Sequence, residues 1–389
     1  MKSLDQLMQK FCSDGVEYKT LSELFQTRNG YTPSKANKSF WENGTVPWFR
    51  MEDIRENGRI LSSATQMVSR SAVKGEPFPA HSIIVATSAT IGEHALITVP
   101  SLANQRFTYL VLKTEYQHLF NIKFLYYYCF KLDEYCKECL NQGNFASVDM
   151  KKFAKFRFPV PPLPVQSEIV KILDNFTELT AELTAELTAR RKQYEYYRDT
   201  LLSASNSVDY KTLPDISLNL DRQRKPVTKG KREYGEYPYY GASGIVDYVS
   251  DYVFDGDYLL ISEDGANLLA RSTPIAFSIS GKNWVNNHAH VIRFDSAEMQ
   301  KYVEIYLNSI DLSKYISGGA QPKLNQDNLN KIPIPVPSFS RVKEIVAILT
   351  KFDTLCNDLT SGLPAEIEAR RKQYEYYRDK LLTFKEASV

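Results

Sequence analysis

The sequence Ala-Arg-Arg-Lys-Gln-Tyr-Glu-Tyr-Tyr-Arg-Asp at Ala189–Asp199 is repeated without change at Ala369–Asp379. Each copy follows a proline-rich strip, at Pro159–Pro164 and at Pro333–Pro337. The offset of 180 residues between the copies is far longer than the unit of a solenoid. The sequence therefore predicts two related half-molecules.

Both copies lie in long patterns that are typical of coiled-coil helices. Apolar residues recur at heptad spacing from about Gln166 to Leu202 and from about Arg341 to Leu382. The first pattern contains Thr-Ala-Glu-Leu twice, at Thr180–Leu187, and each such unit would lengthen a helix by roughly 6 Å. Gly362-Leu363-Pro364 should interrupt or bulge the second helix, because proline has no N–H to donate. The expected seam of the second helix is Ile345, Leu349, Phe352, Leu355, Leu359 and Ile367.

The segments between these helices differ in sequence but keep the same order of parts. Short apolar runs separated by Gly, Pro and Asn predict strands in mixed domains. A helix is expected over Phe120–Asn141 in the first domain and near Ala297–Ile316 in the second. Polar segments also correspond, with Asn104-Gln105-Arg106 matching Asn286–Val291, and Asn141–Asn144 matching Gly318–Asn325.

Composition indicates an ordinary protein without a membrane span or a secretion signal, so we expect it in the cytoplasm. Five unevenly spread cysteines argue against a disulfide framework. The net charge is only +2, so a nucleic-acid surface would have to be a local concentration of basic residues. Asp221–Arg232 is one such concentration, with six basic residues against one acid, and Lys151–Arg157 is another.

Motifs for catalysis are missing from the sequence. There is no Asn-Pro-Pro-Tyr-like tetrapeptide for amino methylation, no phosphate-binding loop, no cofactor fingerprint and no nuclease carboxylate cluster. Cys129, Cys136 and Cys139 fall on one expected helix, so core packing explains them better than zinc. His288 and His290 share a strand face, where hydrogen bonds to DNA or to the backbone are favoured over metal ligation. We predict no metal site and no catalytic residue in this chain.

A variable domain, a proline-rich strip and a long helix with Arg-Arg-Lys-Gln-Tyr-Glu-Tyr-Tyr-Arg, all present twice, resemble the specificity subunit of type I restriction–modification systems over the whole chain. The Thr-Ala-Glu-Leu units look like those of the IC subgroup. Thr32–Lys35, Trp41–Gly44, Val46–Trp48 and Tyr239–Ile245 look like segments common in the target-recognition domains of this family.

The resemblance implies an α+β fold, in which two globular mixed α/β target-recognition domains are separated by two long antiparallel helices that form a coiled coil. The segments would be residues 1–158 with the first recognition domain, 159–206 with the first proline-rich strip and helix, 207–332 with the second recognition domain, and 333–389 with the second strip and helix. Each domain would read one half of a split DNA site.

The resemblance also implies the partners and their cofactors. These would be double-stranded DNA, two copies of a methyltransferase subunit and, for cleavage, ATP-driven restriction subunits. S-adenosylmethionine, ATP and Mg would then bind the partner subunits, and this chain would carry no cofactor.

Loops that mix cationic side chains with Asn, Gln and Ser are candidates for DNA contacts, since phosphates and base edges are bound by these residue types. In the first domain they are Arg28, Tyr31, Ser34, Lys35, Lys38, Arg50, Asn104, Gln105, Arg106 and Asn144. In the second domain they are Arg222, Arg224, Lys225, Lys229, Lys231, Arg232, Asn267, Asn287, His288, Gln321 and Lys323.

Identity of the repeat extends to positions that should point away from a helix seam. These positions are candidates for binding two copies of one partner, and they are Arg191, Lys192, Tyr196 and Arg198 with Arg371, Lys372, Tyr376 and Arg378. The alternative is that they form solvated ion pairs along each helix.

Two other functions remain open at the level of sequence. A free-standing DNA-binding enzyme with two recognition domains would need an active site, and an activity assay on the lone chain would reveal it. A coiled-coil scaffold that binds only proteins would lack the steep salt dependence of DNA binding.

Overall fold

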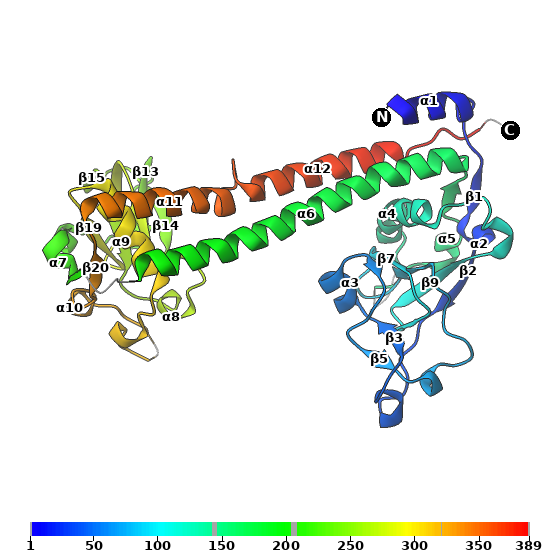
Figure 1. Ribbon diagram of the computed structural model, residues 1–389, viewed down its shortest axis with the longest axis horizontal. Helices are drawn as coiled ribbons and strands as arrows, with labels where there is room; N and C mark the ends of the chain where they lie inside the picture. Colours follow the sequence, from blue (N-terminus) through cyan, green and yellow to red (C-terminus); the bar gives the residue numbers. More distant parts are fainter. Residues whose placement is uncertain (1, 142–145, 204–207, 320, 388–389) are drawn as a thin grey trace. The chain divides into compact units, whose positions relative to one another are not determined.

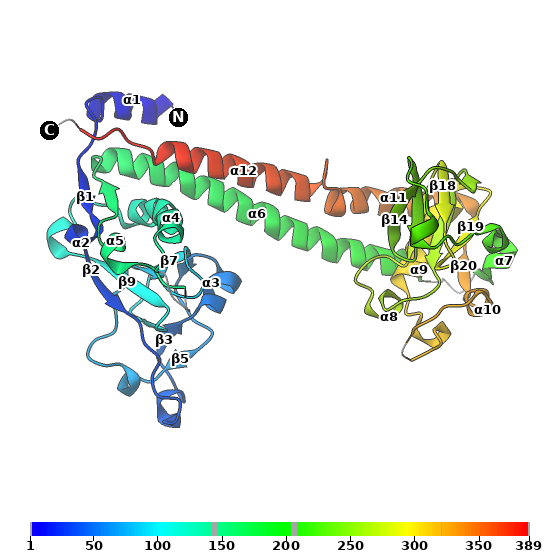
Figure 2. The same cartoon turned by 180° about the vertical axis from the view of Figure 1, so that it is seen from behind.

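The computed structural model describes residues 2–141, 146–203, 208–319 and 321–387. The chain forms two compact units, which we call unit 1 (Met1–Glu182 with Glu368–Val389) and unit 2 (Leu183–Ile367). Each unit combines one recognition segment with parts of both repeat helices. The red end of the second repeat helix accordingly lies with the blue and cyan segments of unit 1 in Figures 1 and 2.

Unit 1 is built on two sheets and a strand pair. The larger sheet has the order β2-β9-β6-β7-β4, the smaller has the order β5-β3-β8, and β1 pairs with β10. Its strands are β1 (Tyr18–Thr20), β2 (Phe25–Asn29), β3 (Val46–Phe49), β4 (Ile60–Leu61), β5 (Met67–Val68), β6 (Ser82–Ala86), β7 (His94–Ile97), β8 (Leu102–Ala103), β9 (Phe107–Leu112) and β10 (Arg157–Pro159). Its helices before the first repeat are α1 (Lys2–Phe11), α2 (Leu21–Leu24), α3 (Met51–Asn57), α4 (Ile122–Glu138) and α5 (Met150–Phe153).

Unit 2 has the orders β12-β19-β16-β17 and β14-β13-β18-β15, and β11 pairs with β20. Its strands are β11 (Asp209–Lys211), β12 (Leu218–Asn219), β13 (Tyr237–Gly241), β14 (Gly244–Val249), β15 (Phe254–Asp255), β16 (Tyr258–Ser262), β17 (Ala276–Ile279), β18 (Lys282–Val285), β19 (Ala289–Arg293) and β20 (Ile334–Val336). Its short and middle-length helices are α7 (Leu213–Ile216), α8 (Asn267–Ala270), α9 (Ala297–Ser309) and α10 (Gln326–Leu329).

The two units share one topology despite their different sequences. β2-β9-β6-β7 corresponds to β12-β19-β16-β17, and all of these neighbours pair antiparallel. Each smaller sheet contains one parallel pair, β3 with β8 or β13 with β18. The mixed α/β recognition domains expected from the sequence are thus present twice.

The central strand of each large sheet is buried on both faces, which fits its continuous apolar sequence. In β6, Ile83 packs in the cluster that contains α4, while Ile84 packs in the cluster that contains β3. In β16, Leu259 faces the cluster of α9 and Leu260 faces the cluster of β18. Alternate side chains therefore join a helix and a second sheet to opposite faces of the strand.

The first repeat helix is α6 (Leu163–Leu202). The second repeat helix is divided into α11 (Phe339–Asn357) and α12 (Leu363–Leu381). In unit 1 the ring of Phe176 on α6 stacks on Tyr377 of α12, at 5.6 Å between centroids. In unit 2 Tyr197 of α6 stacks on Phe352 of α11, also at 5.6 Å. These two contacts are made by corresponding residues of the repeat, so each unit contains the same antiparallel helix contact.

The expected interruption of the second helix is confirmed, because α11 ends at Asn357 and α12 begins at Leu363. A Cβ atom at Gly362 would lie 2.5 Å from the carbonyl oxygen of Thr354, so a larger residue does not fit there. Pro364 is tolerated because the first turn of a helix needs no N–H donor. The prediction that Leu359 lies on the seam is wrong, since the break leaves this side chain 80% exposed.

The other sequence-based helices differ from the structure mainly at their ends. The helix expected over Phe120–Asn141 is α4, and it begins after Asn121, whose side chain accepts a hydrogen bond from the N–H of Lys123. Cys129, Cys136 and Cys139 are buried in the core as expected. Burial raises the pKa of the Cys136 thiol to about 12.

Residues after α12 complete unit 1 by a parallel bridge to the segment before β1. The N–H of Val16 donates to Lys385 O at 2.9 Å, and the N–H of Ala387 donates to Val16 O at 3.0 Å. Phe384 is buried, and Glu386 forms an ion pair with Arg157 of β10. None of the described helices has the combination of length and apolar character that crossing a membrane requires.

Candidate nucleic-acid interface

Three predicted segments of unit 2 meet where β16 ends. The N–H of Glu263 donates to His288 O, and the N–H of Leu324 donates to Glu263 O, both at 2.8 Å. Asp264 and Lys323 form an antiparallel bridge. We call this meeting of Glu263–Asn267, Asn286–His290 and Gly318–Asn325 the unit 2 junction, of which residue 320 lies outside the described residues.

A matching junction is present in unit 1 where β6 ends. The N–H of Thr87 donates to Arg106 O at 3.0 Å, and the N–H of Val148 donates to Thr87 O at 2.9 Å. Ser88 and Ser147 form the corresponding bridge. Arg106 therefore occupies the place of His288, as the matching of loops in the sequence suggested. Asn144 lies outside the described residues.

Beneath each junction three polar side chains lie together at matching positions of the sheet. In unit 1 they are the neutral side chains of Asn29, Thr87 and Thr108. Thr108 donates to Asn29 Oδ1 and shares a hydrogen bond of 2.9 Å with Thr87. In unit 2 they are the ionisable side chains of Asp221, His290 and Glu263. His290 Nδ1 lies 2.6 Å from Asp221 Oδ2 and 3.9 Å from Glu263 Oε2.

The unit 2 trio is neutralised by its own domain. His290 is 1% exposed, and its Nε2 lies 2.8 Å from the carbonyl oxygen of Leu324. The Arg224 guanidinium bonds Glu263 at 2.7 Å and lies 3.5 Å from Asp221. The ligand atoms of the trio are within 4.8 Å of one another, which would suit a metal ion, but two cations, Arg224 and Lys323, already pair with its carboxylates. We therefore assign this cluster to support of the junction.

Hydrogen bonding in this cluster also affects its acids. Burial alone would raise the pKa of Asp221, but hydrogen bonds from His290 and from the Val291 N–H, with the charge of Arg224, lower it below its usual value. The pKa of Glu263 is lowered in the same way, because Arg224, His290 and Lys323 outweigh burial. Both carboxylates are thus held in the charged form at neutral pH.

Most of the DNA-contact candidates of unit 1 are solvent-exposed. These are Arg28, Ser34, Lys35, Lys38, Gln105 and Arg106. The loop after β2 approaches the loop before β9, because the hydroxyl of Thr32 donates to Gln105 Oε1. Tyr31, Arg50 and Asn104 are half-buried. The Tyr31 hydroxyl donates to Ala72 O, and Asn104 Oδ1 accepts from the N–H of Arg106, so these two side chains shape the loops from inside.

The candidates of unit 2 fall into two groups. Exposed ones are Arg222, Lys225, Lys229, Lys231, Asn287, His288, Gln321 and Lys323. Three others are half-buried and engaged within the domain: Arg224 in the trio described above, Arg232 with Asp247 at 3.0 Å, and Asn267 with the backbone of Thr273. Lys323 is exposed but also forms an ion pair with Glu263, at 3.1 Å. The acidic partners of the two arginines, Glu263 and Asp247, lie 39 and 15 residues away, so the sequence did not reveal these pairs.

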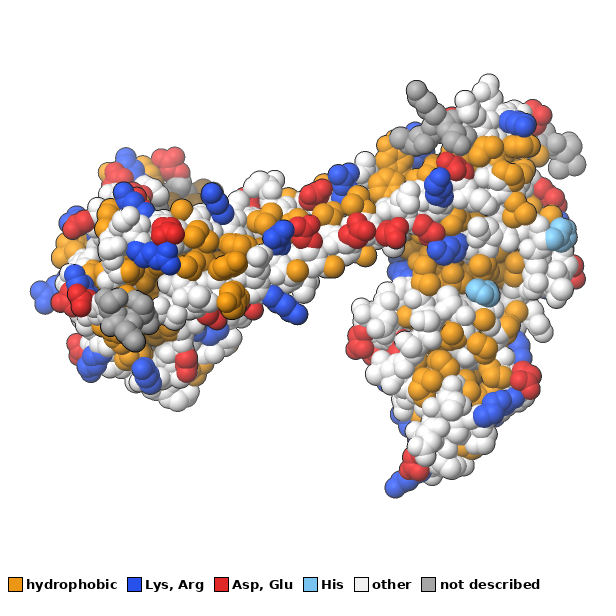
Figure 3. All heavy atoms as spheres, in the orientation of Figure 1, with side chains coloured by type: hydrophobic (Ala, Val, Ile, Leu, Met, Phe, Trp, Pro, Cys, Tyr) orange, Lys and Arg blue, Asp and Glu red, His pale blue; other side chains and the backbone are white. Residues whose placement is uncertain are grey.

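Sequence reasoning also missed residues of the unit 2 junction. Asp264 belongs to this junction, and both of its carboxylate oxygens are 2.9 Å from His288 Nδ1. The available signal was the position of Glu263-Asp264 directly after an apolar strand. On the surface in Figure 3, basic side chains are interspersed with acidic ones, which agrees with the net charge of +2 and leaves local geometry as the guide to contacts.

Three of the candidates for partner binding are exposed in both copies of the eleven-residue repeat. Arg191, Lys192 and Tyr196 are exposed, as are their counterparts Arg371, Lys372 and Tyr376. Tyr196 is 66% exposed and Tyr376 is 62% exposed. We call these two triplets the repeat stripes.

The two remaining partner candidates are half-buried against rings of their own unit. Arg378 lies over the ring of Phe130, at 4.5 Å from its centroid, and Arg198 lies over Tyr194 at 5.8 Å. Of the eight partner candidates, the six residues of the repeat stripes are exposed as predicted, and the two arginines are not.

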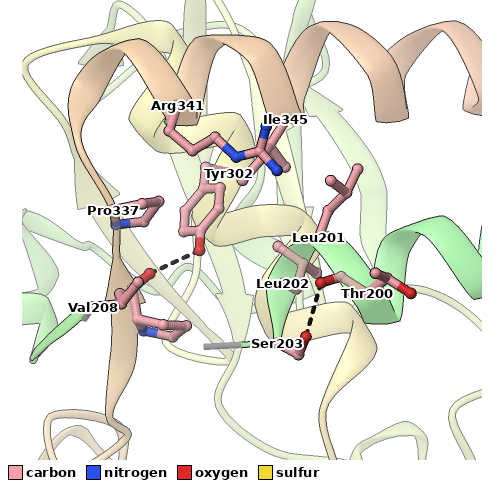
Figure 4. A pocket seen from close by; sticks show the side chains of 10 residues that line it. Thr200, Leu201, Leu202, Ser203, Val208, Tyr302, Pro337, Arg341 and Ile345 are labelled. Carbon is pink, nitrogen blue, oxygen red and sulfur yellow. Dashed lines mark hydrogen bonds between the residues drawn. The ribbon is translucent and has the colours of Figure 1, made fainter. Parts of the chain in front are cut away.

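A cavity of about 270 Å³ lies at the end of α6 in unit 2 and is lined by Leu201, Leu202, Tyr302 and Arg341 among others (Figure 4). The Tyr302 hydroxyl donates to Pro335 O at 2.7 Å beside it. Its lining includes Ser203 and Val208, on either side of residues 204–207, which lie outside the described residues. We assign this cavity no ligand.

The family model for the type I restriction modification DNA specificity domain matches residues 13–190 and 207–369. The specificity subunit of the type I restriction enzyme EcoprrI from Escherichia coli is 48% identical over 363 residues, which cover 89% of each chain. The specificity subunit of EcoR124I/EcoR124II from Escherichia coli is 34% identical over 293 residues, which cover 68% of this chain and 71% of that one.

Solved structures agree in fold. The S subunit of a type I system from M. genitalium matches with a TM-score of 0.58 and 16% identity, covering 95% of this chain and 96% of that one. The two matches of the family model correspond to the two recognition segments, each with part of the long helix that follows. The chain belongs to the family of type I restriction–modification DNA specificity subunits, whose catalytic steps are carried out by separate methyltransferase and restriction subunits.

Proposed function

We propose that this chain, in the cytoplasm, gives a type I methyltransferase and restriction complex its DNA sequence specificity, each unit reading one half of a bipartite site in the major groove. The observation that carries this proposal is the pair of junctions, which have the same backbone framework but different side chains. A shared framework presents each loop set in the same way, while the different side chains suit different base sequences.

The exposed candidates divide by chemistry into two roles. Lysines outside the junctions, such as Lys35, Lys229 and Lys231, suit phosphates, where charge fixes position without reading sequence. Arg106 and His288 lie at the junctions and suit base edges. S-adenosylmethionine, ATP and Mg belong to the partner subunits in this proposal.

The repeat stripes are proposed to bind two copies of the methyltransferase subunit, one on each copy of the repeat. The support is that identical residues are exposed in both units, including one large aromatic side chain in each stripe. Tyr and Arg are enriched in protein–protein interfaces, and each stripe exposes one of each.

The DNA-reading proposal is tested by sequencing methylated adenines in cells that make the complete complex. We expect a bipartite motif with two short half-sites and an unread spacer. Replacing the recognition segment of unit 2 by that of another specificity subunit should change one half-site only. A change in both halves, or methylation without a sequence motif, would count against the proposal.

The partner proposal is tested with the double substitutions Lys192→Glu/Tyr196→Ala and Lys372→Glu/Tyr376→Ala. Each double variant should bind one methyltransferase subunit and the quadruple variant none, as counted by native mass spectrometry. Glu178→Ala, at an exposed position of α6 outside the repeat, is the control and should keep both. Two bound subunits in the quadruple variant would exclude the repeat stripes as the docking surface.

A further inference from the structure

The unit 2 junction contains a hollow of about 370 Å³, lined by Asp264, His288, Gln321, Pro322 and Lys323 among others. The His288 side chain is 50% exposed and Asp264 is 30% exposed. This hollow is open to solvent and polar on several sides. It is formed by the three segments that the backbone hydrogen bonds join.

His288 is held more firmly than its exposure suggests. Both carboxylate oxygens of Asp264 lie 2.9 Å from its Nδ1. Its backbone N–H donates to Asn286 Oδ1 at 2.8 Å, and its carbonyl accepts from Glu263. A surface side chain normally retains its rotamer freedom, and losing that freedom costs free energy. Here the ring is ordered in advance, which reduces the cost of binding.

The contact with Asp264 also selects the tautomer of the ring. Asp264 accepts a hydrogen bond, so the proton of the neutral imidazole lies on Nδ1. Nε2 is then left with its lone pair as an acceptor. In the major groove the matching donors are the amino groups at adenine N6 and cytosine N4.

We propose that His288 reads a base bearing an amino group in the second half-site, and that Asp264 is the residue that positions it. This inference rests on the proposed function, because it takes DNA as the occupant of the junction. Arg106, at the matching place in unit 1, offers only donors, which suit the acceptors of guanine. The two half-sites would thus be read with opposite hydrogen-bonding character from one framework position.

The experiment is the methylated-motif measurement on the complete complex, with each half-site scored separately. In the His288→Ala complex we expect one base of one half-site to lose at least about tenfold of its discrimination. Arg106→Ala is the matched control and should relax the other half-site. His288→Gln tests whether any acceptor suffices, and we expect it to retain part of the discrimination.

Asp264 is tested by comparing two substitutions. Asp264→Ala should relax the same base as His288→Ala, whereas Asp264→Asn keeps an oxygen that accepts from Nδ1 and should restore most of the discrimination. A purely structural role would not give this rescue at one base. Thermal unfolding of each variant verifies that the domain is folded.

The proposal is overturned if His288→Ala leaves the motif unchanged, if it relaxes both half-sites equally, or if both His288 variants abolish methylation. An Asp264→Asn complex as relaxed as Asp264→Ala would remove the positioning role. These outcomes are distinct from failure of the proposed function, in which the unaltered complex would show no bipartite motif.

Discussion

Three matching residue positions under the junctions carry different chemistry in the two units. Asn29, Thr108 and Thr87 are neutral in unit 1, while Asp221, His290 and Glu263 are ionisable in unit 2. The neutral set tolerates changes of pH, and the charged set depends on the ionised carboxylates. A difference in pH response between the units is therefore expected at the scale of single residues.

We predict that Asp221→Asn lowers the free energy of unfolding of unit 2 at pH 7. The difference in this free energy between the variant and the unaltered protein should become smaller as pH falls. The folded-state pKa of Asp221 is lowered, so its stabilising contribution is present above the usual carboxyl pKa of about 4 and is lost as pH falls below it. Hydrogen exchange of β16 amides across this range measures the effect. Asn29→Ala is the matched control, with a cost to β6 that should not change with pH.

The sequence predicted which loops correspond but not how their side chains are paired. Arg224 was predicted to contact DNA because it lies in a basic run, and its partner Glu263 is distant in sequence. The pairing arises only from the register of β16 with β19 and the path of the chain before β13. The exposure of residues such as Lys229 could be predicted from the sequence, because a lysine in a polar loop normally lies at the surface.

Among the elements, α6 is a single helix of 40 residues, and the two Thr-Ala-Glu-Leu units lie within it. Its heptad pattern and the absence of proline from its interior made it predictable. The second helix was predictable as interrupted, but the position of Leu359 was not, since the local path through the break depends on hydrogen bonds. Asp358 accepts from Thr360 and Ser361 there, and these hydrogen bonds lower its pKa.

Insertion of one further Thr-Ala-Glu-Leu unit into α6 should lengthen the helix by about 6 Å and add about 40° of rotation beyond a full turn. We predict that the spacer of the methylated motif changes while both half-sites stay the same. Sequencing of methylated adenines measures this. An insertion of four alanines is the control for length alone, and an unchanged spacer with altered half-sites would refute the prediction.

At the scale of the whole molecule, each unit contains part of the first repeat helix and part of the second. Residues 368–389 belong to unit 1, although they follow all of unit 2 in the sequence. The repeat predicted two half-molecules, but it could not show which helix end joins which domain. That assignment depends on contacts such as Phe130 with Tyr374 and Val16 with Lys385.

Deletion of residues 383–389 should destabilise unit 1 and leave unit 2 intact. The deletion removes buried Phe384, the bridge to Val16 and the exposed ion pair of Glu386 with Arg157. Most of the lost stabilising free energy comes from Phe384 and the bridge, because an exposed ion pair contributes little. Limited proteolysis with mass spectrometry should show early cleavage within residues 1–182. Deletion of residues 388–389 alone is the control, and equal protection of both units in the longer deletion would contradict the prediction.

The late position of residues 368–387 has a consequence for synthesis of the protein on the ribosome. Unit 1 emerges first, yet its last helix and bridging segment are translated after every residue of unit 2. All residues of unit 2 are therefore synthesised before unit 1 receives its final part. A ribosome that stopped near residue 367 would release a chain with a finished second recognition domain and an unfinished first one.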